Sequence, residues 1–315
     1  ACAGHGEEAI PLPWVLSALP SALCNHRHHD LMLLKILAPR PQEVFGDLYF
    51  ELHEEKREVY VVTSVDRSAW PDGVGAIRFG FDPACRQQYA SDEQFRAAFR
   101  QAVADYESVR REIDGLLDER VGDGAAEREA HLASLPQVLT ARERELRTAM
   151  NAFTALKPLS AGDVVKVPTY TPHALQHGVR TIEFQTPVYE RLIVAFAQKV
   201  LTQPHWDTDA AVSKMQLDTP EQPPSACLQD SEGVRVERIV DFADFEVQRY
   251  IVQPGSSLQL PSPEQYGLII VIQGALAIGS RGLGPERGVR VREHDPACRA
   301  ARHGALPRDR QATNA

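Results

Sequence analysis

Two short runs, far apart in the sequence, most constrain how this chain can fold, because each sets polar side chains at the spacing of a strand. In the first run, Glu51 and His53 are two residues apart, so alternation places both on one face of an expected strand. Glu58 follows at the start of an apolar strand, Glu-Val-Tyr-Val-Val. The second run, from Gly162 to His177, predicts a strand, a tight turn and a further strand that carries His173. Together the two runs offer two imidazoles and two carboxylates.

A mixed set of nitrogen and oxygen ligands suits zinc, manganese, iron(II) or nickel, and it does not suit an ion that prefers thiolates. The sequence therefore indicates a metal site that is shared between distant strands. A single His or Glu on a strand is more commonly solvated or hydrogen-bonded, so no one of these residues carries the prediction alone.

The spacing of the two runs resembles the two motifs of the cupin superfamily. Those motifs read Gly, five residues, His-x-His, three or four residues, Glu, and later Gly, five residues, Pro, four residues, His, three residues, Asn. The matching residues in this chain are Gly46, Glu51, His53 and Glu58, then Gly162, Pro168, His173 and His177. Two positions depart from the pattern, because Glu51 replaces the first His, one residue early, and His177 replaces the Asn.

Within the cupins, the flanking segments resemble type I mannose-6-phosphate isomerases over roughly residues 30 to 280. The segments that carry this resemblance are Leu33-Leu-Lys-Ile-Leu-Ala, Lys56-Arg-Glu58-Val-Tyr-Val-Val, Ile77-Arg-Phe-Gly-Phe, Pro172-His-Ala-Leu and Glu183-Phe-Gln185. The resemblance implies a mainly β fold: a cupin barrel, which is a double-stranded β-helix or jelly roll, with a helical insertion. A second, apparently incomplete cupin-like β block is expected after it.

The resemblance also implies the roles of the polar residues. The metal ligands it implies are Glu51, His53, Glu58 and His173, holding one divalent ion, zinc first with Mn²⁺ or Fe²⁺ as alternatives. Lys56 is expected at the mouth of the pocket, where a cation helps to open the sugar ring or neutralise charge. Arg191 resembles the family's catalytic arginine after Glu-Ile-Gln, at a shorter spacing.

The implied reaction is an aldose–ketose isomerisation of a phosphorylated hexose, mannose 6-phosphate to fructose 6-phosphate, so the expected partner is a small sugar phosphate. Two other classes stay open. One is a sugar-binding or regulatory cupin without chemistry, and the other is a cupin oxygenase that uses iron(II). The sequence leaves the oligomeric state open.

Composition excludes several other classes. A net charge of −9 over 315 residues argues against nonspecific nucleic-acid binding. No segment approaches the ~20 apolar residues that span a bilayer, so no membrane partner is expected. The five Cys are odd in number and hold no Cys-x-x-Cys pair, which fits a reducing cytoplasm better than a disulfide framework.

The chain is expected to divide into several parts. A metal-binding cupin domain is predicted over residues 30–215, with a helical hairpin inserted at 91–153 that starts at the capping box Ser91-Asp-Glu-Gln94 and breaks at Gly122-Asp-Gly124. Residues 216–233 are predicted as a linker rich in Pro, Gln and Ser, and 234–280 as a partial C-terminal cupin-like domain. Residues 281–315 are predicted as a disordered, Arg-rich tail.

Overall fold

In the computed structural model, the chain forms two compact units, one of residues 32–223 and one of residues 1–31 and 224–315. The described residues are 2–3, 10–11, 33–118, 132, 134–186, 188–258, 260, 266–278, 281–285 and 288–292. No helix in this described part is long and apolar enough to cross a membrane.

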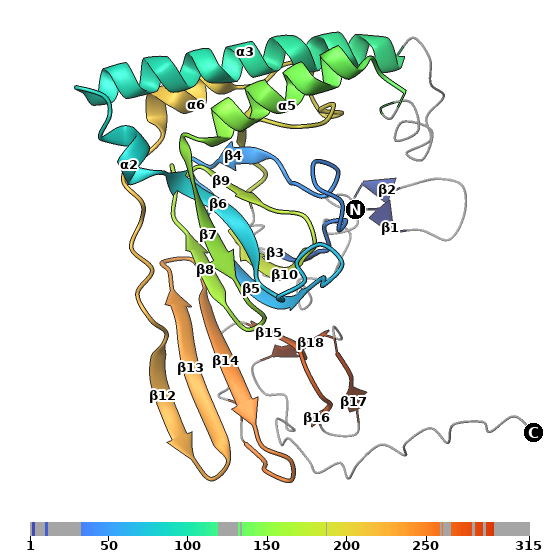
Figure 1. Ribbon diagram of the computed structural model, residues 1–315. Coiled ribbons are helices and arrows are strands. Elements are labelled where there is room, and N and C mark those ends of the chain that lie inside the picture. The colour runs from blue at the N-terminus through green and yellow to red at the C-terminus, as the bar shows by residue number, and fades with distance from the viewer. Residues whose placement is uncertain are drawn as a thin grey trace, which may run out of the picture. The chain divides into compact units, whose positions relative to one another are not determined.

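The unit of residues 32–223 is built on two antiparallel sheets (Figure 1). The four-stranded sheet has the order β3 (Leu33–Leu37), β10 (Val179–Gln185), β5 (Glu58–Val65) and β8 (Val164–Val167). The five-stranded sheet has the order β11 (Leu192–Ala195), β4 (Phe50–Leu52), β9 (His173–Leu175), β6 (Gly75–Phe81) and β7 (Thr154–Leu159).

One buried cluster of apolar side chains joins the two sheets. Its members are Tyr60, Val62, Ile77, Phe79, Leu159, Val165, Val167, Leu175 and Val179. On several strands the same alternating row is polar at one end: Glu58 precedes Tyr60 on β5, and His173 precedes Leu175 on β9. The polar residues of the sequence motifs are therefore gathered at one end of an interior that is apolar beyond them.

A bulge in β6 changes which face its last aromatic residue covers. Ile77 and Phe79 lie in the cluster between the sheets, whereas Phe81 packs with the helices. The pairing of β6 with β7 shifts register between Arg78 and Phe81, and Gly80 between them has φ of +70°. Glycine adopts that backbone conformation without steric cost, and the extra residue turns Phe81 to the opposite face.

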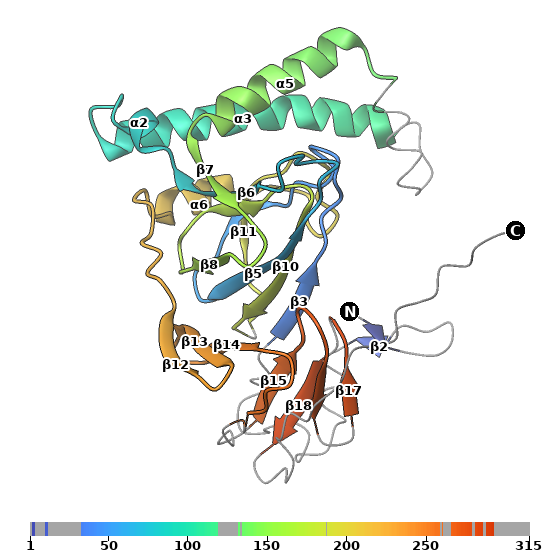
Figure 2. The same cartoon turned by 60° about the horizontal axis from the view of Figure 1, so that its bottom comes forward.

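The described residues of this unit form four helices: α2 (Pro83–Arg86), α3 (Asp92–Asp118), α5 (Gln137–Asn151) and α6 (Thr208–Lys214). Figures 1 and 2 both show α3 and α5 side by side on the same side of the sheets, with α3 leading away from β6 and α5 returning to β7. Side chains of α3 pack in one buried cluster with Phe50 and Leu52 of β4 and Ile193 of β11. The five-stranded sheet therefore carries the helices on the face opposite the polar motif residues.

The start of α3 follows the capping box. Ser91 Oγ accepts a hydrogen bond from the Gln94 amide at 3.3 Å, and Gln94 Oε1 accepts one from the Ala90 amide at 3.2 Å. The buried face of α3 includes Val103 and Leu117, and their neighbours Ala102 and Leu116 are partly buried. The expected break at residues 122–124 lies outside the described residues.

The second unit contains only strands among its described residues. Its three-stranded sheet has the order β12 (Ala226–Ser231), β13 (Val234–Asp241) and β14 (Glu246–Val252). Three two-stranded pairs accompany it: β1 (Cys2–Ala3) with β2 (Ile10–Pro11), β15 (Tyr266–Ile270) with β18 (Gly288–Arg292), and β16 (Leu276–Ile278) with β17 (Arg281–Leu283). The mainly β fold class with a helical insertion is confirmed.

Strands lie in two segments that the sequence analysis assigned to a linker and to a tail. The predicted linker, residues 216–233, contains β12, whose six residues are all exposed. Its pairing rests on backbone hydrogen bonds along β13, so it lacks the apolar alternation by which a strand is recognised. The predicted disordered tail, residues 281–315, contains β17 and β18 up to Arg292, and the remainder lies outside the described residues.

Candidate metal centre

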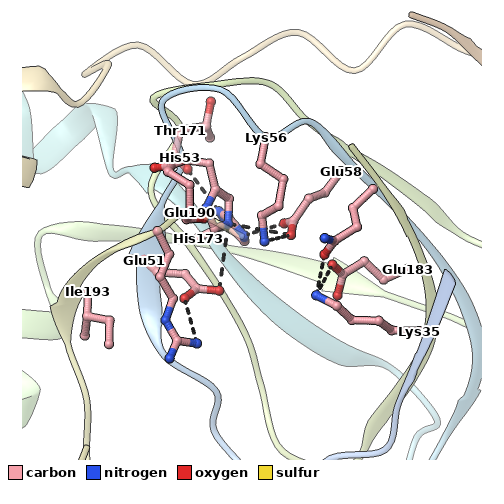
Figure 3. A network of polar contacts seen from close by, with 12 residues as sticks. Lys35, Glu51, His53, Lys56, Glu58, Thr171, His173, Glu183, Glu190 and Ile193 are labelled. Atoms are coloured by element: carbon pink, nitrogen blue, oxygen red, sulfur yellow. Dashed lines mark hydrogen bonds and ion pairs between the residues drawn. The ribbon is translucent and has the colours of Figure 1, made fainter. Parts of the chain in front are cut away.

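Three side chains from the two motif runs converge at the polar end of the barrel interior. Glu51, His53 and His173 each offer one ligand atom, and these atoms all lie within 4.8 Å of one another. Both imidazoles are 1% exposed, and the Glu51 side chain is 17% exposed. Figure 3 shows the three side chains pointing toward one another.

Neighbouring strands bring these residues together. Glu51 of β4 and His173 of β9 are directly paired in the antiparallel ladder, so their side chains project on the same face. His53 follows immediately after β4 and continues the same alternating row. Phe79 of β6 pairs with His173 from the other side. Residues more than a hundred positions apart therefore meet through one cross-strand pairing.

Backbone carbonyls orient the two imidazoles. Nδ1 of His53 lies 2.8 Å from the Glu190 carbonyl oxygen, and Nδ1 of His173 lies 3.0 Å from the Thr171 carbonyl oxygen. A carbonyl only accepts, so each Nδ1 carries the hydrogen, and each Nε2 faces the cluster. This is the arrangement in which histidine binds a metal through Nε2.

Two atoms of the cluster are buried without a hydrogen-bond partner among the described residues. They are Nε2 of His53 and Oε2 of Glu51. A buried polar atom without a partner costs free energy, on the order of 1–3 kcal/mol. A cation held by the Glu51 carboxylate and by Nε2 of His53 would give both groups a partner, so the side chains present fit a divalent ion.

Glu58 lies against both imidazoles. Its carboxylate oxygens are 3.6 Å from Nε2 of His53 and 3.1 Å from Nε2 of His173, and it accepts a hydrogen bond from the Tyr60 hydroxyl at 2.9 Å. Burial opposes its ionisation, but the hydrogen bond from His173, the nearby ring of His53 and the charges of His173 and Lys56 place the pKa of Glu58 well below its ordinary value. Glu58 is therefore a charged, buried carboxylate beside the three clustered residues.

Lys56 is buried, whereas the sequence led us to expect it at the mouth of the pocket. It is 6% exposed, and its ammonium group is bound to the Glu58 carboxylate. Burial lowers the pKa of Lys56, but the charges of Glu58 and Glu51 outweigh that effect and raise it. A buried ammonium requires such a partner, and this pairing draws Lys56 into the interior.

A second polar group, which sequence reasoning did not assign to the site, continues from Glu58 along β10. Glu183 is 3% exposed and accepts a hydrogen bond from Lys35 Nζ at 3.0 Å, while Lys35 also donates to the Gln185 side chain. Burial, followed by the negative charge of Glu58, raises the pKa of Glu183 to about 8. Glu183 and Gln185 belong to a motif that the sequence singled out, but nothing in the sequence indicates that Lys35 binds them.

Solved structures of mannose 6-phosphate isomerases share the architecture of this chain. The enzyme from Bacillus subtilis matches with a TM-score of 0.55 at 13% sequence identity, covering 84% of this chain and 70% of that one. The apo form from Salmonella typhimurium matches with a TM-score of 0.58 at 12% identity, covering 93% of this chain and 84% of that one. The Salmonella typhimurium enzyme bound to its substrate f6p and to zinc matches with a TM-score of 0.58 at 12% identity, covering 89% and 78%.

The chain has the fold of the mannose 6-phosphate isomerases. By sequence, no protein-family model matches it and no curated protein is significantly similar to it. The resemblance that the short motifs indicated is thus confirmed at the level of structure, while the identity of 12–13% supports the fold alone.

Arg191 lies at the edge of the cluster in this isomerase fold. Its guanidinium is 3.9 Å from Oε2 of Glu51, donates a hydrogen bond to Thr202 at 2.9 Å, and lies over the rings of Tyr49 and Tyr189 at 4.6 Å and 5.8 Å. Its side chain is 20% exposed. Arg191 is therefore close enough to neutralise part of the charge of Glu51.

His177, which stands where the cupin pattern has Asn, is bound elsewhere. Its Nδ1 lies 2.7 Å from Oδ1 of Asp47, which also accepts a hydrogen bond from the His177 amide at 3.0 Å. Trp70 stacks on its ring at 4.8 Å and donates from Nε1 to its carbonyl at 2.7 Å. These contacts hold the turn after β9 against the start of the first motif.

Proposed function

We propose that this protein is a metal-dependent aldose–ketose isomerase that interconverts mannose 6-phosphate and fructose 6-phosphate. One observation carries the proposal: inside a barrel of the isomerase fold, two buried imidazoles turn Nε2 toward the Glu51 carboxylate. Among the described residues, Nε2 of His53 and Oε2 of Glu51 have no hydrogen-bond partner. Fold alone would not support it, because one barrel hosts many chemistries.

The proposed ligands of one divalent ion, zinc or alternatively Mn²⁺ or Fe²⁺, are Glu51, His53, Glu58 and His173. Two nitrogens and two carboxylates form a donor set that suits zinc. When bound, such an ion supplies Lewis acidity that stabilises negative charge developing on the substrate oxygens. Glu51 adds a negative charge to the donor set, and Arg191 at 3.9 Å offsets part of that charge.

The surrounding residues supply fixed charge and protons for moving a hydrogen between adjacent carbons. Lys56 stays cationic at neutral pH because its pKa is raised, so its part is electrostatic and it does not serve as a base. Glu183 keeps its proton below about pH 8, so it is a proton donor next to the charged Glu58. Arg191 is the proposed cation at the outer edge of the site, where a phosphorylated substrate would need one.

The test combines elemental analysis with a coupled assay for mannose 6-phosphate and fructose 6-phosphate. We expect one divalent ion per wild-type chain, loss of that ion in His173→Ala, and its retention in His205→Ala, a control histidine whose side chain is 67% exposed. A His173→Ala variant that keeps its full complement of metal removes the site from the proposal.

A second variant distinguishes the proposed isomerase from the two alternative functions. Glu51→Gln should raise the rate of the metal-loaded protein, because removing a ligand charge increases the Lewis acidity of the ion. If neither the metal-loaded wild type nor Glu51→Gln interconverts the two sugar phosphates, the barrel is a sugar-binding module. Oxygen consumption that requires iron(II) would instead identify an oxygenase.

A further inference from the structure

Residues between β10 and β11 form hydrogen bonds with the turn between β4 and β5, which carries His53. At one end, the Thr186 amide donates to the Arg57 carbonyl at 3.0 Å, and the Arg57 amide donates to the Thr186 hydroxyl at 3.1 Å. At the other end the contacts are made by Glu190. The position of the turn therefore depends on a segment that is distant in sequence.

Glu190 binds three consecutive residues of that turn. Its backbone carbonyl accepts the hydrogen of His53 Nδ1 at 2.8 Å. Its carboxylate accepts the amide hydrogen of Glu54, with 3.0 Å to each oxygen, and that of Glu55 at 3.3 Å. Hydrogen bonds to an ionised carboxylate are stronger than those between neutral groups. One residue thus anchors both the imidazole and the backbone that carries it.

We infer that Glu190 is a positioning residue that sets the tautomer and orientation of His53 for metal binding, an inference that rests on the metal site proposed above. Among the described residues, the His53 ring has one hydrogen-bond partner, the Glu190 carbonyl. If that carbonyl turns away, the hydrogen of the neutral imidazole is free to move to Nε2, and a protonated Nε2 has no lone pair for a metal.

The hydrogen bonds of the Glu190 carboxylate keep the Glu190 carbonyl in place. Glu190 lies between β10 and β11, where residues 188–191 belong to no strand, so no sheet ladder holds its peptide group. The two amide contacts from Glu54 and Glu55 instead fix the residue against the turn. Removing partners that orient a metal-binding histidine typically weakens metal affinity 10–100-fold.

The test compares Glu190→Ala and Glu190→Gln with Glu54→Gln, a control in the same turn whose carboxylate is bound by Lys214 at 2.6 Å on the surface. Co²⁺ affinity is measured by competition with a chelating dye. We expect Glu190→Ala to bind Co²⁺ about 10–100-fold more weakly. Glu190→Gln keeps one side-chain oxygen that can accept from the backbone amides, so its Co²⁺ affinity should lie between those of Glu190→Ala and the wild type. The Co²⁺ affinity of Glu54→Gln should match that of the wild type.

The tautomer of His53 is read separately in the metal-free proteins, from the ring ¹⁵N and ¹H resonances that disappear in His53→Gln. The wild type should carry the hydrogen on Nδ1, and Glu190→Ala should shift it toward Nε2. Wild-type Co²⁺ affinity together with an unchanged tautomer in Glu190→Ala overturns the inference. If the wild type itself binds no Co²⁺, the proposed metal site fails, while the tautomer still decides whether Glu190 orients His53. If Glu190→Ala does not fold, Glu190→Gln is judged by the same two criteria.

Discussion

Replacing Glu183 with Gln should change how the stability of the protein depends on pH. Glu183 is 3% exposed, and burial together with the nearby charge of Glu58 raises its pKa to about 8 from an ordinary value of 4.5. The ammonium group of Lys35, 3.0 Å away, lowers the pKa but does not cancel these effects. The folded protein therefore holds a proton on Glu183 at a pH where the unfolded chain has released it.

The sign and size of the effect follow from the two pKa values of Glu183. The stabilisation linked to this proton is fully present below pH 4.5 and is lost as the pH rises through about 8. Each pH unit between these limits lowers the free energy of unfolding by about 1.36 kcal/mol. Between about pH 5.5 and about pH 7.5 the loss is about 2–3 kcal/mol, because the folded state begins to ionise near the upper limit.

The assay is chemical denaturation of the metal-free protein in the presence of a chelator. Glutamine at position 183 is neutral at every pH, so the free energy of unfolding of the variant should gain about 2–3 kcal/mol relative to that of the wild type between the two pH values. Glu221→Gln, at an exposed position, serves as the control, and its difference from the wild type should not change over that range. A Glu183→Gln difference that is equally constant would refute the reasoning.

Two further predictions concern stability and are measured by denaturant midpoints. Gly46→Ala should destabilise by about 3 kcal/mol, because its Cβ would lie 1.9 Å from the carbonyl oxygen of Arg40, whereas Gly115→Ala in α3 meets nothing within 4 Å and should stabilise by about 0.5–1 kcal/mol. Equal midpoints for these two variants would contradict the packing at Gly46. Tyr106→Phe removes the buried hydrogen bond to Glu143 at 3.0 Å and should cost about 1–3 kcal/mol, and an unchanged midpoint would show that Glu143 finds another partner.

Local periodicity explains which parts of the fold could be read from the sequence. The apolar residues of α3 recur at helical spacing and Ser91 caps its first turn, so this helix is recognisable without its neighbours. β12 is the opposite case. All six of its residues are exposed, and only its hydrogen bonds to β13 make it a strand. Such a strand leaves no mark in the pattern of hydrophobicity.

The candidate site was only partly accessible to sequence reasoning. His53 and His173 were recognisable because their order follows a known motif, and Glu51 because it stands in place of the first His of that motif. The roles of Lys35 and Glu190 were not, because each depends on a partner that lies more than a hundred residues away in the chain. Which side chains meet across a sheet depends on register, and a shift of one residue turns every side chain to the other face.

By itself, the sequence determined the alternation of the strands, the apolar face of the long helix and the order of the two polar motifs, since all of these are local or nearly local patterns. Only the tertiary structure decided that Glu51 pairs with His173, that Lys56 is buried against Glu58, and that a glutamate carbonyl orients His53. The physical reason is that burial and cross-strand register arise from packing between distant segments. The pKa values and unpartnered atoms that give the site its chemistry arise only there.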